Sequence, residues 1–91
     1  MSNKVVITDY FVKGMRALPP DRQRRAIAAI EKFMRDAAVP SLDFRPLKGK
    51  AGFFIIDANS GDRIILKRVE ADTYEAMDVG PHDNVYRRWD R

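Results

Sequence analysis

The sequence predicts an α+β domain in which two N-terminal helices pack on one face of a small antiparallel sheet. Helical periodicity fills the first half of the chain, and short β-branched strands separated by tight turns fill the second half. A length of 91 residues allows one domain, residues 1–91, with a single modest core. The expected order is β-α-α-β-β-β followed by a short C-terminal helix, with a sheet of three or four strands. Both helices must cover the same face, because their apolar stripes need a partner.

The first half contains one strand and both helices. Residues 4–8 are mostly β-branched and predict the first strand, after which Thr8 or Asp9 can cap a helix over residues 10–18. A Pro-Pro pair ends that helix, and a second helix is expected over residues 21–37. The apolar stripe of the first helix consists of Phe11, Met15 and Leu18. The stripe of the second consists of Ile27, Ile30, Phe33, Met34 and Ala37.

The second half alternates strands with turns. A loop over residues 42–52, rich in Pro, Gly and Lys, precedes a strand over residues 53–57. The turn at residues 59–62 predicts a hairpin into a return strand over residues 63–67. A further strand is expected over residues 74–79, and the terminal helix should begin shortly after it.

Alternation along the return strand separates two faces of the sheet. Ile64 and Leu66 are expected to face the helices, whereas Arg63, Ile65 and Lys67 should face the other side. That second side is partly charged and partly apolar, which is typical of an open, functional face.

Composition limits the kinds of protein this can be. Hydrophobic residues make up 45% of the chain, and there is no cysteine, so disulfides and thiolate zinc sites are excluded. The N-terminus lacks a signal-peptide pattern, and the longest apolar run, residues 53–56, is far too short to span a membrane. We therefore expect a cytoplasmic protein without a metal or small-molecule cofactor. The net charge of +4 favours an anionic partner.

The C-terminal tail contains the residues best suited to chemistry. His82, the only histidine, can transfer protons near neutral pH, and helical spacing places Tyr86 on the same face. Tyrosine can stack on RNA bases, although Tyr86 could equally dock on the sheet. His82 could instead be a loop residue with a local hydrogen bond. Trp89 is interpreted mainly as an anchor for the tail.

Basic residues from three segments of the chain are expected to converge on the open face. The expected phosphate-binding set is Arg45, Lys48, Lys50, Arg63, Arg87 and Arg88, with Arg91 near it in the tail. Arg63 has an alternative role in a surface ion pair with Asp57 or Glu75. A second cluster, Arg22, Arg24 and Arg25, is interpreted as a solvated helix face.

Three stretches of the chain resemble the RelE/ParE toxin superfamily of bacterial toxin–antitoxin systems. Residues 18–33 are similar to its helical hairpin. Residues 44–49, Phe-Arg-Pro-Leu-Lys-Gly, resemble its stretch before the second strand. Residues 62–66 and 79–86 resemble its later strand and its "V-G-x-H-D-x-V-Y" ending. The resemblance covers nearly the whole chain and implies a RelE-like fold and a cognate antitoxin partner.

The nuclease branch of that superfamily implies a ribosome-dependent endoribonuclease that cleaves mRNA without a metal. Its reaction is attack by a ribose 2′-hydroxyl on the adjacent phosphate. By resemblance, Arg63 stabilises the phosphorane, His82 is the acid or base, and Tyr86 stacks or orients. Lys48 and Lys50 would bind the RNA backbone.

One departure from the family pattern keeps other functions open. Many nucleases of the family carry another arginine in the second strand, whereas residues 53–57 contain no basic residue and end in Asp57. The alternatives are a ParE-like toxin that inhibits DNA gyrase and a catalytically weak toxin-fold module that acts by binding.

Overall fold

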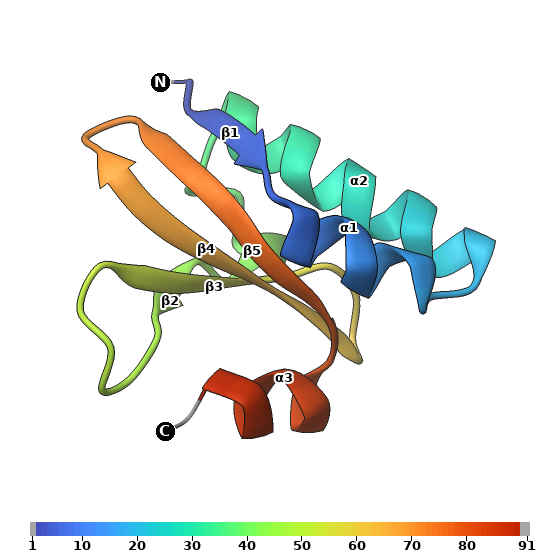
Figure 1. The fold of residues 1–91 in the computed structure, drawn as a ribbon. Helices are drawn as coiled ribbons and strands as arrows, with labels where there is room; N and C mark the ends of the chain where they lie inside the picture. Colours follow the sequence, from blue (N-terminus) through green and yellow to red (C-terminus); the bar gives the residue numbers. More distant parts are fainter. Residues whose placement is uncertain (1, 90–91) are drawn as a thin grey trace.

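The computed structural model describes residues 2–89 and confirms the predicted α+β class (Figure 1). Its elements, in chain order, are β1 (Lys4–Ile7), α1 (Asp9–Arg16), α2 (Pro20–Arg35), the 3-10 turn η1 (Pro40–Leu42), β2 (Arg45–Pro46), β3 (Phe53–Asp57), β4 (Asp62–Glu70), β5 (Thr73–Pro81) and α3 (His82–Trp89). β4 and β5 are longer than predicted, and both N-terminal helices end about half a turn early. None of the described helices is long and apolar enough to cross a membrane.

The five strands form one sheet in the order β1-β5-β4-β3-β2. The expectation of three or four strands was wrong, because Arg45 and Pro46, placed in a loop by the sequence, pair with Ile55 and Phe54 of β3. A two-residue strand has too little alternation to be recognised. The sheet is mostly antiparallel, as expected, but β1 runs parallel to β5 at one edge.

α1 and α2 cover one face of the sheet, as predicted (Figure 1). The main core on this face joins the helices to β3, β4 and β5. Phe33 of α2 is fully buried, and its ring contacts Tyr74 of β5 edge-on, with 4.9 Å between centroids. Phe11, Leu18, Ile64 and Leu66 are buried in the same cluster, which confirms the face assigned to Ile64 and Leu66.

The predicted stripe of α2 was partly wrong. Ile27 is 49% exposed, whereas the buried residues are Ala26, Ala29, Ile30 and Phe33. These residues follow the spacing i, i+3, i+4, i+7 and therefore form one face. Ile27 lies outside this face and therefore points toward solvent.

The second face of the sheet carries a smaller core under α3. Ile65 of β4, Ile55 of β3 and Val85 of α3 are buried together, with Leu47 from the loop that follows β2. Ile65 lies on the predicted face. However, the face expected to be open is partly covered, because Val85 and its neighbours supply an apolar side to α3 that packs onto the sheet.

An ion pair ties the start of α2 to the β3–β4 hairpin. Arg22 donates from Nε and Nη2 to the two carboxylate oxygens of Asp62, at 2.8 and 2.7 Å. Asp62 is 1% exposed and also accepts from Asn59 Nδ2 at 2.7 Å. The hydrogen bonds from Arg22 outweigh burial and lower the pKa of Asp62. The assignment of Arg22 to a solvated helix face was therefore wrong.

Candidate functional site

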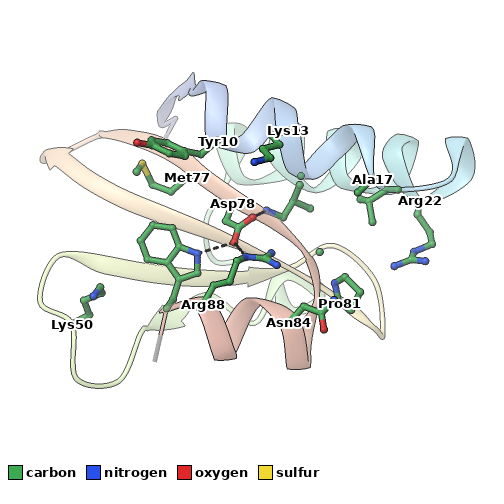
Figure 2. Close-up of a pocket in the computed structure, with 15 residues that line it drawn as sticks. Tyr10, Lys13, Ala17, Arg22, Lys50, Met77, Asp78, Pro81, Asn84 and Arg88 are labelled. Carbon is green, nitrogen blue, oxygen red and sulfur yellow. Dashed lines mark hydrogen bonds and ion pairs between the residues drawn. The ribbon is translucent and has the colours of Figure 1, made fainter. Parts of the chain in front are cut away.

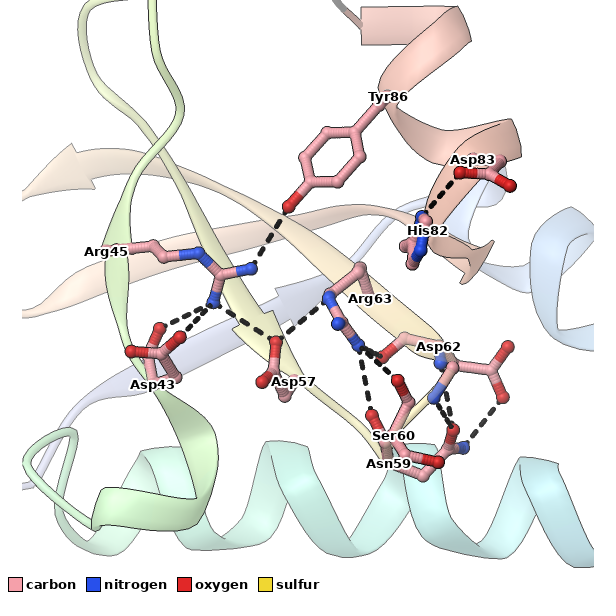
Figure 3. Close-up of polar contacts among 11 residues, drawn as sticks. Asp43, Arg45, Asp57, Asn59, Ser60, Asp62, Arg63, His82, Asp83 and Tyr86 are labelled. Atoms are coloured by element: carbon pink, nitrogen blue, oxygen red, sulfur yellow. Dashed lines mark hydrogen bonds and ion pairs between the residues drawn. The ribbon is translucent and has the colours of Figure 1, made fainter.

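A cluster of polar side chains lies where the hairpin end of the sheet meets α3 (Figure 3). β2 supplies Arg45, β3 ends in Asp57, and β4 supplies Arg63 directly opposite Asp57 in the antiparallel register. The first helical turns of α3 supply His82 and Tyr86. The cluster therefore joins four elements that are separated along the chain.

Asp57 lies between the two arginines. Its Oδ1 is 3.1 Å from Nη1 of Arg45 and 3.1 Å from Nε of Arg63. The Asp57 side chain is 24% exposed, so its charge is partly shielded from water. One carboxylate thus partly neutralises both guanidinium groups at this point of the surface.

Arg63 is held mainly by the hairpin that precedes it. Its Nη1 donates to the backbone carbonyls of Asn59, Ser60 and Asp62 at 3.1 to 3.3 Å. Its side chain is 15% exposed, and Nε, although close to Asp57, has no well-directed hydrogen bond within residues 2–89. Arg63 braces the turn and forms the ion pair with Asp57 that was its alternative role.

Arg45 connects the cluster to α3. Its Nη1 donates to the backbone carbonyl of Asp43 at 2.7 Å, and its Nη2 donates to the Tyr86 hydroxyl at 3.1 Å. Burial opposes the charged form, but the hydrogen bonds to Tyr86 and Asp57 outweigh it and raise the pKa of Arg45. At 29% exposure, the Arg45 side chain is more accessible than that of Arg63.

His82 is positioned by its neighbours at the start of α3. Its backbone N–H donates to the carbonyl of Gly61 at 2.9 Å, which attaches the helix to the hairpin. Its Nδ1 lies 2.7 Å from Oδ1 of Asp83, and its ring is 5.9 Å from that of Tyr86. The His82 side chain is 46% exposed, so the ring is oriented and still accessible to a ligand.

The predicted basic set is brought together only in part. Arg45 and Arg63 meet at Asp57, whereas no hydrogen bond or ion pair within residues 2–89 links the other four predicted cations to this cluster. Lys50 lies over the ring of Phe53 at 5.8 Å, and Arg88 binds Asp78 on the opposite flank of α3. Lys48 and Arg87 are exposed, and Arg91 lies outside the described residues.

Asp78 was missed by sequence reasoning. Its carboxylate lies on β5, and Oδ2 accepts from Nε of Arg88 and from Nε1 of Trp89, each at 2.7 Å. The Trp89 ring lies 5.6 Å from that of Phe53, as expected of an anchor for the tail. The available signal was an acidic residue between the apolar Met77 and Val79 of a predicted strand, since buried acids need a partner.

Solved toxin structures share this fold. RelE in the RelB-RelE antitoxin–toxin complex from Methanococcus jannaschii superposes with a TM-score of 0.71 at 22% identity, covering 89% of this chain and 94% of the other. A mutant of the E. coli toxin RelE in the free state superposes with a TM-score of 0.69 at 15% identity, and the match covers 96% of this chain and 93% of the other. A chain of the E. coli DinJ-YafQ toxin-antitoxin complex superposes with a TM-score of 0.66 at 11% identity, and the match covers 94% of this chain and 99% of the other.

These likenesses confirm the RelE-like fold expected from the sequence. No protein-family model matches the chain, and no curated protein matches it by sequence.

Proposed function

We propose that this chain, with its RelE-type fold, is the toxin of a type II toxin–antitoxin system and acts in the cytoplasm. Two observations support the proposal. The similar solved structures include complexes named as antitoxin–toxin pairs, and the sequence itself resembles the superfamily over nearly its whole length. A cognate antitoxin is accordingly the proposed protein partner.

We further propose that the toxin is a ribosome-dependent endoribonuclease that acts on mRNA. The observation that carries this proposal is the placement of His82, which is oriented by Asp83 and lies one helical turn before Tyr86. Tyr86 in turn contacts Arg45 through its hydroxyl. A proton carrier and a guanidinium, two of the groups that phosphodiester cleavage uses, therefore lie on one surface beside a tyrosine.

The proposed reaction is intramolecular transesterification. The ribose 2′-oxygen bonds to phosphorus as its proton leaves to a base, and the bond from phosphorus to the 5′-oxygen breaks as that oxygen gains a proton. The products are a 2′,3′-cyclic phosphate and a 5′-hydroxyl. Because Nδ1 of His82 lies beside Asp83, Nε2 is the ring nitrogen left to exchange one of these protons with the RNA.

Arginine and lysine would supply the positive charge. Arg63 was predicted to stabilise the phosphorane, but its Nη1 already contacts three carbonyls, so we propose that the more accessible Arg45 shares this role. Tyr86 would stack on a base or orient the phosphate. The remaining cations, Lys48, Lys50, Arg87 and Arg88, are proposed to contact RNA backbone around the site.

Asp57 favours a second candidate function. Its carboxylate partly cancels the charge of Arg45 and Arg63, the two arginines of the cluster. A site neutralised in this way suits a toxin that acts by binding, either on DNA gyrase or as a catalytically weak module. A toxin that acts only by binding needs no proton carrier. Loss of activity on removal of His82 therefore distinguishes the nuclease from the binding toxin.

Cleavage of mRNA by purified ribosomes with the added protein tests the nuclease proposal. His82→Ala should reduce the rate by about 10²–10⁴-fold, because it removes the proton carrier. Arg63→Ala should reduce it by about 10²–10³-fold if this arginine stabilises the phosphorane. Arg24→Ala, an exposed change on α2 that removes the same charge as Arg63→Ala, is the control.

Circular dichroism must confirm that each variant folds, especially Arg63→Ala, since this side chain braces the hairpin. Unchanged cleavage by folded His82→Ala would remove histidine from the mechanism. Inhibition of gyrase by a wild-type protein that cleaves no mRNA would select the binding alternative.

A further inference from the structure

The turn between β3 and β4 contacts two of the residues to which the proposed reaction gives a role (Figure 3). Nη1 of Arg63 donates to the carbonyls of Asn59 and Ser60 at 3.1 and 3.3 Å. The backbone N–H of His82 donates to the carbonyl of Gly61 at 2.9 Å. Three consecutive carbonyls of one turn therefore set where the Arg63 guanidinium lies relative to the start of α3.

The side chain of Asn59 fixes the conformation of this turn. Its Oδ1 accepts from the backbone N–H groups of Gly61 and Asp62, both at 2.8 Å. Asparagine favours turns because its side chain can accept a hydrogen bond from the backbone two residues further along the chain. Without these two hydrogen bonds, the carbonyls that hold Arg63 and His82 would lose their common support.

The other end of the Asn59 amide is bound to the buried carboxylate of Asp62. Nδ2 donates to Oδ2 of Asp62 at 2.7 Å, and Arg22 of α2 donates to both oxygens of the same carboxylate. An ionised carboxylate only accepts hydrogen bonds, so it orients the amide with Nδ2 toward Asp62 and Oδ1 toward the turn. The turn is thereby fixed relative to α2.

The far end of α3 is held independently of the turn (Figure 2). Asp78 of β5 accepts from Nε of Arg88 and from Nε1 of Trp89, each at 2.7 Å. Val85, in the middle of the helix, is fully buried against the sheet. A change at Asn59 should therefore shift the first turn of α3 without releasing the helix from the sheet.

The hydrogen bonds of Arg63 and Asn59 suit them to different roles. Nη1 of Arg63 is bound to carbonyls of the hairpin, whereas no hydrogen bond from its Nη2 is present among residues 2–89, so Nη2 remains available to a phosphate. Asn59 has no such freedom, because Oδ1 already accepts from two N–H groups and Nδ2 is bound to Asp62. Its side chain is suited to hold the turn and not to bind RNA.

We propose that Asn59 is a positioning residue for RNA cleavage, which holds the Arg63 guanidinium and the first turn of α3, with His82, in the arrangement that the reaction needs. The inference rests on the proposed nuclease function and deepens it by adding a residue that touches neither the RNA nor the reacting atoms. A misplacement of about 1 Å can reduce a rate about 10²-fold. Loss of the Asn59 side chain should therefore affect the rate of cleavage and not the binding of RNA.

Cleavage of mRNA on purified ribosomes, measured at increasing concentrations of the ribosome–mRNA complex, separates these two effects. Asn59→Ala should lower kcat by about 10- to 100-fold and leave KM within about twofold, because every cation proposed to bind RNA stays in the protein. Asn59→Ser, which keeps one oxygen for the turn, should fold more readily and lower kcat by only about 3- to 10-fold.

Two variants control for the loss of an amide and for the loss of stability. Asn3→Ala removes another half-buried amide, which donates to the carbonyl of Phe33 at 3.1 Å next to the β1 edge of the sheet. Ile30→Ala lowers stability by opening the main core. Both should keep the kcat of wild type at a temperature at which circular dichroism shows that all the variants are folded.

Nitrogen-edited NMR of the same proteins tests the geometry without RNA. The Nε–H resonance of Arg63 and the backbone amide resonance of His82 should move in Asn59→Ala and should keep their positions in Asn3→Ala. This measurement does not depend on the proposed reaction, so it tests the positioning by itself.

The outcomes distinguish this inference from the proposed function. Cleavage by Asn59→Ala with the kcat of wild type, or with only a raised KM, overturns the inference and leaves the nuclease proposal standing. An equal fall in kcat in Asn3→Ala or Ile30→Ala overturns it too, because the role of Asn59 would then be purely structural. Resonances of Arg63 and His82 that do not move overturn it even where cleavage falls. A wild-type protein that cleaves no mRNA overturns the nuclease proposal and the inference with it.

Discussion

Replacing Arg22 with alanine should cost more stability than replacing any other arginine at the start of α2. The change deletes two hydrogen bonds, of 2.8 and 2.7 Å, to a carboxylate that is 1% exposed. Breaking a buried ion pair typically costs about 3–5 kcal/mol, because one charge remains buried without a partner. The Arg22 side chain is 37% exposed, so water can reach Asp62 in the variant, and Asp62 also keeps its hydrogen bond from Asn59. We therefore expect a smaller loss, of ~1–3 kcal/mol, typical of a buried polar group that loses part of its hydrogen bonding.

The loss should depend on pH in a defined direction. Hydrogen bonding by Arg22, and then by Asn59, lowers the pKa of Asp62 in the folded state against the effect of burial. A group with a depressed folded pKa stabilises the protein above its unfolded pKa, about 4 for aspartate, and loses this effect as the pH falls through the folded value. The difference between wild type and Arg22→Ala should therefore be largest near neutral pH and shrink below about pH 4.

Urea unfolding followed by tryptophan fluorescence at several pH values measures both effects. Arg24→Ala, at an exposed position without an ion pair in the described chain, should change the free energy of unfolding by less than about 0.5 kcal/mol. A double-mutant cycle with Asp62→Asn isolates the pair. An Arg22→Ala protein as stable as Arg24→Ala at neutral pH would refute the reasoning.

Three further predictions follow from packing and charge. Ile30→Ala should lower the free energy of unfolding by about 2–5 kcal/mol, whereas Ile27→Ala, at an exposed position, should lower it by less than about 1 kcal/mol. Equal losses of unfolding free energy for the two variants, measured in urea, would mean that α2 is rotated. Gly14→Ala should destabilise by about 1–3 kcal/mol, because its Cβ would press on the Val79 carbonyl; a melting temperature equal to that of wild type would contradict the close packing of α1. Asp57→Asn should strengthen binding of a short RNA by about tenfold, since it removes the acid that pairs with both Arg45 and Arg63. An RNA affinity equal to that of wild type throughout a salt titration would show that these arginines do not contact RNA.

Much of the fold could be predicted because local patterns and tertiary packing agree. The turn at residues 59–62 and the alternation of Ile64, Ile65 and Leu66 specify a hairpin with two different faces, and the structure has both. Ile27 was misplaced because periodicity gives the spacing of an apolar face but not which of two overlapping faces meets the sheet. The face that is buried includes Ala26 and Ala29, whose small side chains give a weak apolar signal beside Ile27.

The candidate site was less predictable because it depends on contacts between distant segments. His82 and Tyr86 could be paired from helical spacing alone. The contact between Arg45 and Tyr86 depends on a two-residue strand that no pattern reveals, and Asp57 meets both arginines only through the sheet register. Arg88 and Lys50 carry the right charge for the predicted RNA surface, yet the direction of their side chains is set by Asp78 and Phe53.

The parallel pairing of β1 with β5 has a consequence for the order of folding. β1 is synthesised before the other strands of the sheet, but residues 4–7 pair with residues 73–76, so this strand must wait for β5. Closing so long a loop is entropically costly and slow compared with forming the hairpins of β3, β4 and β5. The sheet can therefore be completed only after β5 has emerged from the ribosome, and we expect the edge formed by β1 to assemble last.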